Sequence, residues 1–210
     1  MRGNFISFEG IEGTGKSTQA RLLYQYLLDK GYEAVITEEP GGTPISLRIR
    51  EVLLSVDHKN MAPLTELLLY NAARTQHIRE VILPATDKGT IVITDRFTDS
   101  TYAYQGYGRG IDLKLLDDID RMATGRLRPD LTILLDLDVE TGLKRNRGIN
   151  KTDRLELEDI EFHQRVRNGY LELASKEPER IKTVDASGNI EEIQNRVVRI
   201  VTDFLSNQKE

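Results

Sequence analysis

The sequence predicts an α/β protein in which a five-stranded parallel sheet is flanked by helices. Two observations lead to this class. Short apolar runs, rich in β-branched residues, alternate with longer segments of helical periodicity, and glycine, proline or aspartate closely follows each run. Strands that alternate with helices form a parallel sheet covered on both faces, and ligands bind beyond the carboxyl ends of its strands. The predicted strands are 4–9, 33–37, 90–94, 131–135 and 181–184.

Helical periodicity fills the segments between these strands. In the first helix, Leu23 and Leu27 share one face and Gly31 supplies the stop signal. After the second strand, Pro40 and two glycines break the chain. The predicted helices are 17–30, 45–55, 64–86, one that begins near 100, 112–124, one that begins at 139, 158–176 and 190–205.

Polar or chain-breaking residues follow all five strands. Because parallel strands end at the same edge of a sheet, we expect these residues to gather on one rim, where a ligand would bind. The residues are Gly10, Pro40, Asp95, Asp136 and Asp185.

Composition limits the classes of function. The chain has 210 residues, a net charge of −5 and 30% charged residues, which argues against a general nucleic-acid-binding protein. It has no cysteine, which excludes disulfides, zinc–thiolate sites and cysteine nucleophiles and fits a reducing cytoplasm. We find neither a signal peptide nor an apolar stretch long enough to span a membrane. We therefore predict one cytoplasmic domain over 1–210, with no nucleic acid and no membrane as a partner.

The first loop matches the phosphate-binding pattern G-x4-G-K-[ST] at every position. Its glycines allow backbone N–H groups to surround an anion, and the following helix presents its positive end to the same phosphate. Lys16 would reach the β- and γ-phosphates of ATP, and the Ser17 hydroxyl would ligate Mg²⁺. A glycine-rich turn that merely starts a helix would not need this spacing. The predicted ATP-binding residues here are Gly10, Ile11, Glu12, Gly13, Thr14, Gly15, Lys16, Ser17 and Thr18.

A phosphate loop shows nucleotide binding but not the reaction, and a kinase competes with a GTPase-type switch. The segment 150–153 spells N-K-x-D, the guanine-binding motif of GTPases. That motif normally follows a hydrophobic strand, whereas here the basic segment 144–148 precedes it. The D-x-x-G motif, which should come earlier, occurs only at 185–188. Four-residue matches arise easily by chance, so we favour the kinase.

Asp95 and Arg96 directly follow the third strand. An acidic residue at this position of a phosphate-loop enzyme acts near Mg²⁺, directly or through a water molecule. Arg96 offers a planar guanidinium to a phosphate group. A structural ion pair at the end of a strand is the alternative interpretation.

Four segments together resemble the bacterial thymidylate kinases, a family of P-loop nucleoside monophosphate kinases, and the resemblance runs from Asn4 to about Leu205. The segments occur in the family's order and at similar spacing. They are FEGIEGTGKS at 8–17, EPGGT at 39–43, DRF at 95–97 and STYAYQG at 100–106. The resemblance implies the P-loop NTPase fold with a flexible lid at about 144–156. It further implies transfer of the γ-phosphate of ATP to dTMP, with Mg²⁺ as cofactor, in a homodimer.

The resemblance also implies roles for individual residues. Arg96 and Arg50 resemble arginines that bind the acceptor phosphate. Tyr70 and Arg74, four residues apart on one predicted helix, resemble the ring that stacks on thymine and the arginine that binds its carbonyl. Gln105 and Thr101 resemble contacts to the edge of the base, and Tyr104 the ring beneath the sugar. The implied dTMP-binding residues are Glu12, Glu39, Pro40, Arg50, Tyr70, Arg74, Arg96, Ser100, Thr101, Tyr104 and Gln105, and the implied metal ligands are Ser17, Asp95 and Glu12.

Several of these residues have plain structural alternatives. Tyr70 follows three leucines and could belong to the core. Arg50 could be a solvated charge on an amphipathic helix. Ser100 and Thr101 could cap a helix, which would not exclude binding.

The sequence departs from the family pattern in three places. Glu38 stands where many relatives carry an arginine, so Arg48 or Arg50 would have to supply that charge. Tyr70 replaces a frequent phenylalanine but keeps the stacking face. The variable loop positions 13 and 14 are not basic, which resembles the family members whose catalytic arginine lies on the lid.

The lid segment contains four basic residues: Arg145, Arg147, Lys151 and Arg154. An arginine that closes over the transferring phosphate accelerates transfer and excludes water. We rank Arg147 and Arg154 first for this role and assign Arg145 to ATP binding, although a solvated basic loop is the alternative. The predicted catalytic residues are Lys16, Asp95, Arg96, Arg147 and Arg154.

The sequence leaves two rival functions open. One is another P-loop nucleoside monophosphate or deoxynucleoside kinase, against which the segment 100–105 argues by resemblance only. The other is a non-enzymatic, nucleotide-dependent switch.

Overall fold

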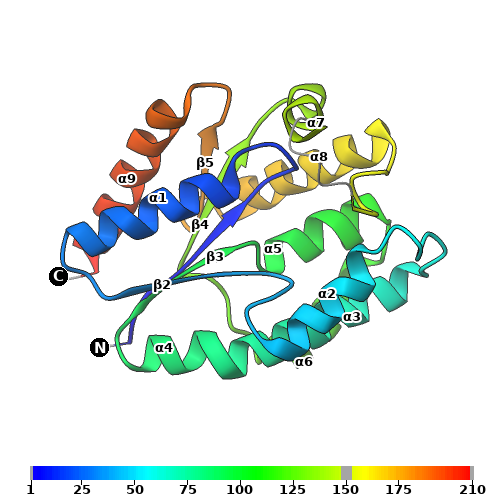
Figure 1. The fold of residues 1–210 in the computed structure, drawn as a ribbon, viewed down its shortest axis with the longest axis horizontal. Helices are drawn as coiled ribbons and strands as arrows, with labels where there is room; N and C mark the ends of the chain where they lie inside the picture. The colour runs from blue at the N-terminus through cyan, green and yellow to red at the C-terminus, as the bar shows by residue number, and fades with distance from the viewer. Residues whose placement is uncertain (1, 148–152, 209–210) are drawn as a thin grey trace.

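The computed structural model describes residues 2–147 and 153–208. Its sheet has five parallel strands in the order β2-β3-β1-β4-β5 (Figure 1). The predicted α/β class is confirmed, and each strand begins and ends within one residue of its predicted range. The strands are β1 (Phe5–Glu9), β2 (Ala34–Glu38), β3 (Ile91–Asp95), β4 (Leu131–Asp136) and β5 (Ile181–Asp185).

Two helices, α1 (Lys16–Asp29) and α9 (Ile190–Asn207), cover one face of the sheet. Alternate residues of a strand point to opposite faces, and Ile6 and Phe8 of β1 join Leu23 of α1 in the core on this side. All three side chains are fully buried. Burying an apolar side chain of this size contributes about 1.5–3 kcal/mol, so this core holds the phosphate loop on a rigid support.

The opposite face carries the helices that supply most of the predicted site residues. Phe5 of β1 points to this side and packs edge-on against Phe97, with ring centroids 4.8 Å apart. The helices are α2 (Pro44–Leu54), α3 (Pro63–His77), α4 (Leu83–Asp87), α5 (Thr98–Thr101), α6 (Leu113–Thr124), α7 (Val139–Arg147) and α8 (Ile160–Lys176).

The predicted helix 64–86 is divided, with a π-helical turn η1 (Ile78–Ile82) between α3 and α4. Pro84 lies at the start of α4. Proline has no N–H to donate to the carbonyl four residues earlier, and its ring crowds that carbonyl, so the preceding turn widens. Periodicity located the helix correctly but did not reveal this change of winding.

The helix predicted from about residue 100 is α5, followed by a second π-helical segment η2 (Tyr102–Gly108). Gly108 allows α8 to approach closely, since a Cβ there would lie 2.7 Å from a ring carbon of Phe162. As a result, α8 packs closely on η2, and the predicted residues Tyr104 and Gln105 of η2 are both buried.

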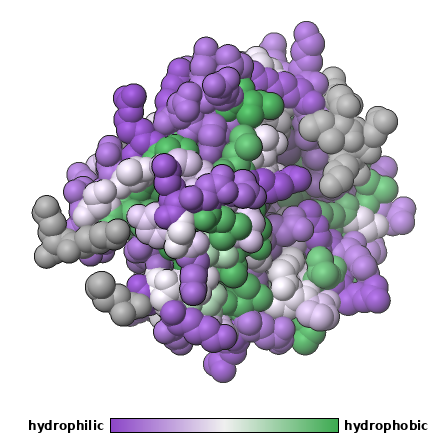
Figure 2. All heavy atoms as spheres, turned by 60° about the vertical axis from the view of Figure 1, so that its left-hand side comes forward, coloured by the Kyte–Doolittle hydropathy of each residue, from purple (hydrophilic) through white to green (hydrophobic). Residues whose placement is uncertain are grey.

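Among the described residues, no helix is both long and apolar enough to cross a membrane. Hydrophilic residues cover most of the face shown in Figure 2, with apolar residues in smaller groups between them.

Candidate active site

The phosphate loop joins β1 to α1 through glycines in backbone conformations that other residues rarely adopt. The φ angles of Gly13 and Gly15 are 74° and 90°. A Cβ on Gly13 would also lie 1.9 Å from the carbonyl oxygen of Gly142 in α7, so space as well as conformation requires glycine. In the described part of the chain no side chain caps the N-terminus of α1, so its first N–H groups are available to an anion.

Lys16, the first residue of α1, is buried beneath this loop. Its Nζ donates to the carbonyl oxygen of Ile11 at 2.7 Å. Burial, and next the charge of Arg96, lower the pKa of Lys16 to about 8, while the carboxylates of Asp95 and Glu12 oppose the shift. The ammonium group is therefore held where a phosphate in the loop would become its main counter-charge.

Ser17 and Asp95 meet beside the loop, where the Ser17 hydroxyl donates to the Asp95 carboxylate. Hydroxyl and carboxylate oxygens are ligands that Mg²⁺ accepts, usually with only one or two protein carboxylates and the phosphates of the substrate. The described residues contain no cluster of three or more metal-binding side chains, so a metal held by the protein alone has no candidate site among them. This pair is what the chain offers to a phosphate-bound cation.

Arg96 is the residue at which the separate parts of the site meet. Its backbone has a φ of 73°, unusual for a residue other than glycine, and turns the side chain back under the loop. The guanidinium donates to the carbonyl of Gly10 at 3.0 Å and to Glu12 at 3.0 Å. It also lies over the ring of Tyr104, 5.0 Å from the centroid. Its remaining partners are the hydroxyls of Ser100, Tyr104 and Tyr170, each at 3.1 Å.

Two glutamates flank Arg96 and differ in their electrostatics. Burial, with the charge of Asp99, raises the pKa of Glu9 to about 7, although a hydrogen bond from Ser100 opposes the shift. Burial would also raise the pKa of Glu12, but the neighbouring His163 ring and the charges of Arg96 and Lys16 hold it well below its usual value. Glu12 is thus a firmly ionised acceptor, while Glu9 titrates near neutral pH.

Arg74 lies on the inner face of α3 and is almost completely buried. Its guanidinium donates to Glu39 at 2.7 Å, to Thr101 at 2.8 Å and to the carbonyl of Phe97 at 3.1 Å. It also stacks over the Phe97 ring, 5.2 Å from the centroid, and lies 3.6 Å from Asp120. Three of the predicted segments, at Glu39, Phe97 and Thr101, therefore converge on one cation.

Glu66, one helical turn before Tyr70, forms a second buried centre. Gln105 donates to it from Nε2 at 2.8 Å. Arg154 lies 2.6 Å away, and Arg109 donates to both carboxylate oxygens at 3.2 Å. Tyr70 is half-buried and packs against the core cluster that includes Tyr104.

The two candidate replacements for the missing loop arginine differ in position. Arg50 donates to the carbonyl of Pro40 at 2.7 Å and lies 3.4 Å from Glu38. Arg48 is exposed and pairs with Glu51 on its own helix at 3.0 Å. Arg50 is therefore the one that reaches the loop after β2.

The residues of the predicted lid are only partly described. Arg145 donates to the carbonyls of Ala186 and Ser187, in the loop that follows β5. Arg154 is buried on Glu66 and donates to the carbonyl of Leu53 at 3.1 Å, rather than lying at the phosphate loop. The side chain of Arg147, as well as Lys151 and most of the 150–153 motif, lies outside the described residues.

The structure brings Lys16, Ser17, Asp95 and Arg96 together with the acceptor segment at one edge of the sheet. Sequence reasoning overlooked several groups that hold this arrangement. Glu9 had a recognisable signal, an acidic residue at the end of a buried apolar strand. Tyr170 and His163 on α8 had none, because their site partners are distant in the sequence. The overlooked residues are Glu9, Glu66, His77, Arg109, His163 and Tyr170.

A parallel sheet of this order, a glycine-rich phosphate loop between β1 and α1, and an acidic residue after β3 that contacts the loop serine define a P-loop nucleotide-binding enzyme. More specifically, the chain belongs to the thymidylate kinase family: the family model for thymidylate kinase matches residues 8–197.

Individual relatives agree with this family. The chain is 51% identical to the thymidylate kinase of Pelobacter propionicus, over 98% of this chain and 97% of the relative. It is 52% identical to the thymidylate kinase of Geotalea daltonii, over 97% and 99% respectively. Among solved structures, it is similar to the thymidylate kinase of Ehrlichia chaffeensis, with a TM-score of 0.77, 35% identity and coverage of 96% of this chain and 99% of that one.

Proposed function

We propose that this protein transfers the γ-phosphate of ATP to dTMP, giving ADP and dTDP. Membership of the family supports the reaction, and one observation carries the geometry: the Arg96 guanidinium contacts both the phosphate loop, at Gly10, and the acceptor segment, at Ser100 and Tyr104. Phosphoryl transfer requires a donor and an acceptor phosphate that meet in line beside positive charge. Arg96 occupies that meeting point.

Catalysis in this proposal is positioning and neutralisation of charge. The acceptor phosphate is already anionic, so no strong general base is needed. Lys16 binds the β- and γ-phosphates, and Arg96 binds the acceptor phosphate. Mg²⁺ supplies charge neutralisation on the transferring phosphate when it is bound with ATP, and Ser17 and Asp95 would hold it. Glu12, predicted as a further ligand, instead accepts hydrogen bonds from Arg96 and Tyr104 here, so we assign it to the acceptor site.

We assign the thymine to the space beside Tyr70. The side chains of Glu66, Tyr70 and Arg74 share one face of α3, because they are four residues apart. Arg74 contacts Thr101 at one end of this face, and Glu66 contacts Gln105 at the other. A base that stacks on Tyr70 therefore lies between Arg74 and Gln105, and both have the polar groups to recognise its edge. Tyr104 lies near the sugar.

We propose that 144–156 forms the lid of a single kinase domain. The loop cannot supply the arginine that stabilises the transferring group, since its variable positions are Gly13 and Thr14. Arg147 and Arg154 are the lid candidates, and Arg145, beside the loop after β5, is the candidate for the adenine side. With Arg154 on Glu66, the carboxyl-terminal end of the lid is attached to the acceptor side of the site.

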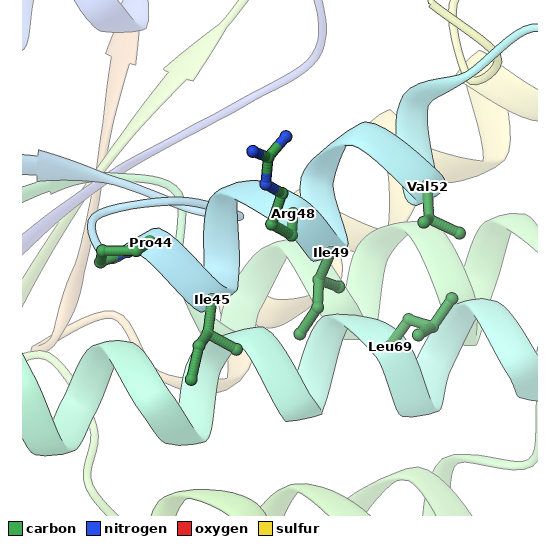
Figure 3. Close-up of a pocket in the computed structure, with 6 residues that line it drawn as sticks. All are labelled: Pro44, Ile45, Arg48, Ile49, Val52 and Leu69. Carbon is green, nitrogen blue, oxygen red and sulfur yellow. The ribbon is translucent and has the colours of Figure 1, made fainter.

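We further propose a homodimer that forms through α2 and α3. Pro44, Ile45, Arg48, Ile49 and Val52 of α2 and Leu69 of α3 line a shallow groove, in which Ile45 and Ile49 point toward α3 and Arg48 points away (Figure 3). Ile45 of α2, together with Leu64 and Leu68 of α3, are large apolar residues that are about half exposed. A second copy would cover them.

Light scattering tests the proposed dimer. It should give a dimer mass for the wild type and a monomer mass for Leu68→Arg. A monomeric wild type would contradict the proposal.

One assay separates the proposed function from its rivals. ATP consumption is measured side by side with dTMP, dUMP, dCMP, AMP and thymidine as acceptors. We expect dTMP to give by far the highest kcat/KM, and rapid ADP release on its addition excludes a non-enzymatic switch. A higher kcat/KM for AMP or thymidine would instead identify a different nucleotide or nucleoside kinase.

We also propose that the reaction takes place in the cytoplasm, because a chain without cysteine is compatible with a reducing compartment.

A further inference from the structure

Glu66 has no part in the proposed chemistry, yet it is completely buried and contacts both the acceptor site and the lid. Burial would raise its pKa, but hydrogen bonds from Arg109 and Gln105 and the charge of Arg154 lower it below the usual value. Glu66 is therefore ionised, and an ionised carboxylate can only accept hydrogen bonds.

This restriction decides the orientation of the Gln105 amide. An amide has one end that donates, the nitrogen, and one that accepts, the oxygen. Beside an ionised carboxylate only the nitrogen gives a favourable contact, and Nε2 of Gln105 lies 2.8 Å from Oε1 of Glu66. The amide oxygen of Gln105 must then face away from Glu66.

The position of Gln105 determines what that oxygen meets. Glu66 and Arg74 are the two ends of one face of α3, and Tyr70 lies between them. Arg74, at one end of this face, contacts Thr101 of α5. Glu66, at the other end, contacts Gln105 of η2, so the two contacts lie on either side of Tyr70. Gln105 therefore lies beside the space in which the proposed function places the base, and the oxygen is the end of its amide that Glu66 does not occupy.

We propose that Glu66 determines the base specificity of the acceptor site by fixing the Gln105 amide with its oxygen toward the base. Thymine and uracil carry an N–H at N3 that donates to this oxygen. Cytosine has a lone pair at N3, which is repelled by it. Glu66 is thus a positioning residue that acts through Gln105. This inference rests on the proposed function, because it assumes a pyrimidine monophosphate beside Tyr70.

Glu66→Gln tests the inference, because a neutral amide at 66 can accept or donate and no longer fixes Gln105. The readout is kcat/KM for dTMP, dUMP and dCMP. The preference for dUMP over dCMP, which differ only in the base edge, should fall by about tenfold, the size of one lost hydrogen-bond discrimination. The preference for dTMP over dUMP depends on the methyl group and should stay unchanged. An unchanged dUMP preference, or an equal fall in both ratios, would overturn the proposal.

Two further variants complete the experiment. Glu158→Gln removes the other carboxylate that contacts Arg109, which lies 2.6 Å from the guanidinium. This variant should change neither ratio of kcat/KM values. A similar loss of the dUMP preference in Glu158→Gln would overturn the proposal. The exchange Glu66→Gln with Gln105→Glu puts an acceptor-only group beside the base and should restore the wild-type ratio. This exchanged variant keeps one carboxylate in the buried cluster, so it still tests the proposal if Glu66→Gln alone does not fold. A tenfold loss of the dUMP preference in the exchanged variant would contradict the proposal.

These outcomes are distinct from failure of the proposed function. A wild type that phosphorylates neither dTMP nor dUMP removes the function and, with it, the inference. A wild type that prefers dTMP, together with a Glu66→Gln variant that still rejects dCMP, removes only the role of Glu66.

Discussion

The phosphate loop and the proposed acceptor pocket of this kinase present different chemical groups to their ligands. The loop consists of eight consecutive residues and presents mainly backbone groups, shaped by glycine conformations. The proposed pocket consists of side chains from α3, α5, η2 and α8 and of Arg96 after β3, and four of its polar groups have a glutamate as partner. Glu9 holds Ser100, Glu12 holds Arg96, Glu39 holds Arg74 and Glu66 holds Gln105.

The difference follows from what each region must do. A phosphate is the same in every nucleotide, so a local backbone cradle suffices. Distinguishing one base from another requires polar side chains in a dry pocket, and buried polar groups are costly unless each has a partner. The glutamates are therefore a second layer that keeps the pocket in one arrangement before any substrate arrives.

The largest expected effect concerns the lid, which neither region contains. We expect the double variant Arg147→Ala, Arg154→Ala to lower kcat by about 10³-fold or more, with little change in KM for ATP, because an arginine over the transferring group acts in the transition state. Steady-state ADP release with dTMP is the measurement. Because Arg154 is held on Glu66, the single variant at 147 should account for most of the loss. A double variant at full rate would remove the lid from the mechanism.

Lys16→Ala tests the loop itself. Loss of this ammonium should lower kcat by about 10²- to 10³-fold with every acceptor, since it removes one preorganised charge at the transferring phosphate. Lys30→Ala, just after α1, is the matched control and should behave as the wild type. Wild-type ADP release from the Lys16 variant would contradict the assignment of the loop.

Arg96→Ala tests the point where the two regions meet. We expect KM for dTMP to rise by about 10- to 100-fold, the size of a charge-assisted hydrogen bond to phosphate, and KM for ATP to change far less. Titration of each nucleotide at saturating levels of the other gives both values, with the exposed Arg48→Ala as control. Equal increases in the two KM values would place Arg96 on both substrates, and unchanged dTMP saturation would remove it from the acceptor site.

The smallest expected effect is on stability and comes from Glu9, which lies beneath both regions. Its pKa is about 7 in the folded protein, whereas its ordinary value is 4.5, so above pH 4.5 the native state retains a proton that the unfolded chain releases. The free energy of unfolding, measured against Glu9→Gln, should therefore fall by about 2 kcal/mol from pH 5 to pH 7. Denaturant titrations of both proteins give this difference. Parallel pH profiles would show that Glu9 is ionised throughout this range.

The sequence predicted the sheet and the loop well because both are locally encoded. A short apolar run such as 131–135 forms a buried strand, and the run itself marks the position of that strand in the sequence. The residues of the phosphate loop are consecutive, so their pattern is visible in the sequence without the fold. The division of the helix at 78–82 was missed because periodicity reports which face is apolar and not how tightly the backbone winds.

The arrangement of the candidate acceptor site was only partly predictable, for a physical reason. The resemblance pointed to Arg74 and Gln105 as candidates, but the glutamates that contact them lie 35 and 39 residues away, and only the folded chain shows these pairings. Arg154 shows the same limit. A basic residue in a lid segment suggests a phosphate contact, whereas its place on Glu66 depends on a helix almost 90 residues earlier.

The close approach of Gly13 to Gly142 has a consequence for how this enzyme could change. The carbonyl of Gly142 occupies the place where any side chain at 13 would begin, and a Cβ on Gly142 would in turn lie 2.6 Å from the carbonyl of Glu12. Helix α7, which contains Gly142, leads into the segment that we propose as the lid. An arginine in the loop at 13 would therefore have to displace this helix. A catalytic arginine at this loop position would therefore require more than a single substitution, because the contact between Gly13 and Gly142, which joins the loop to α7, would have to be rebuilt.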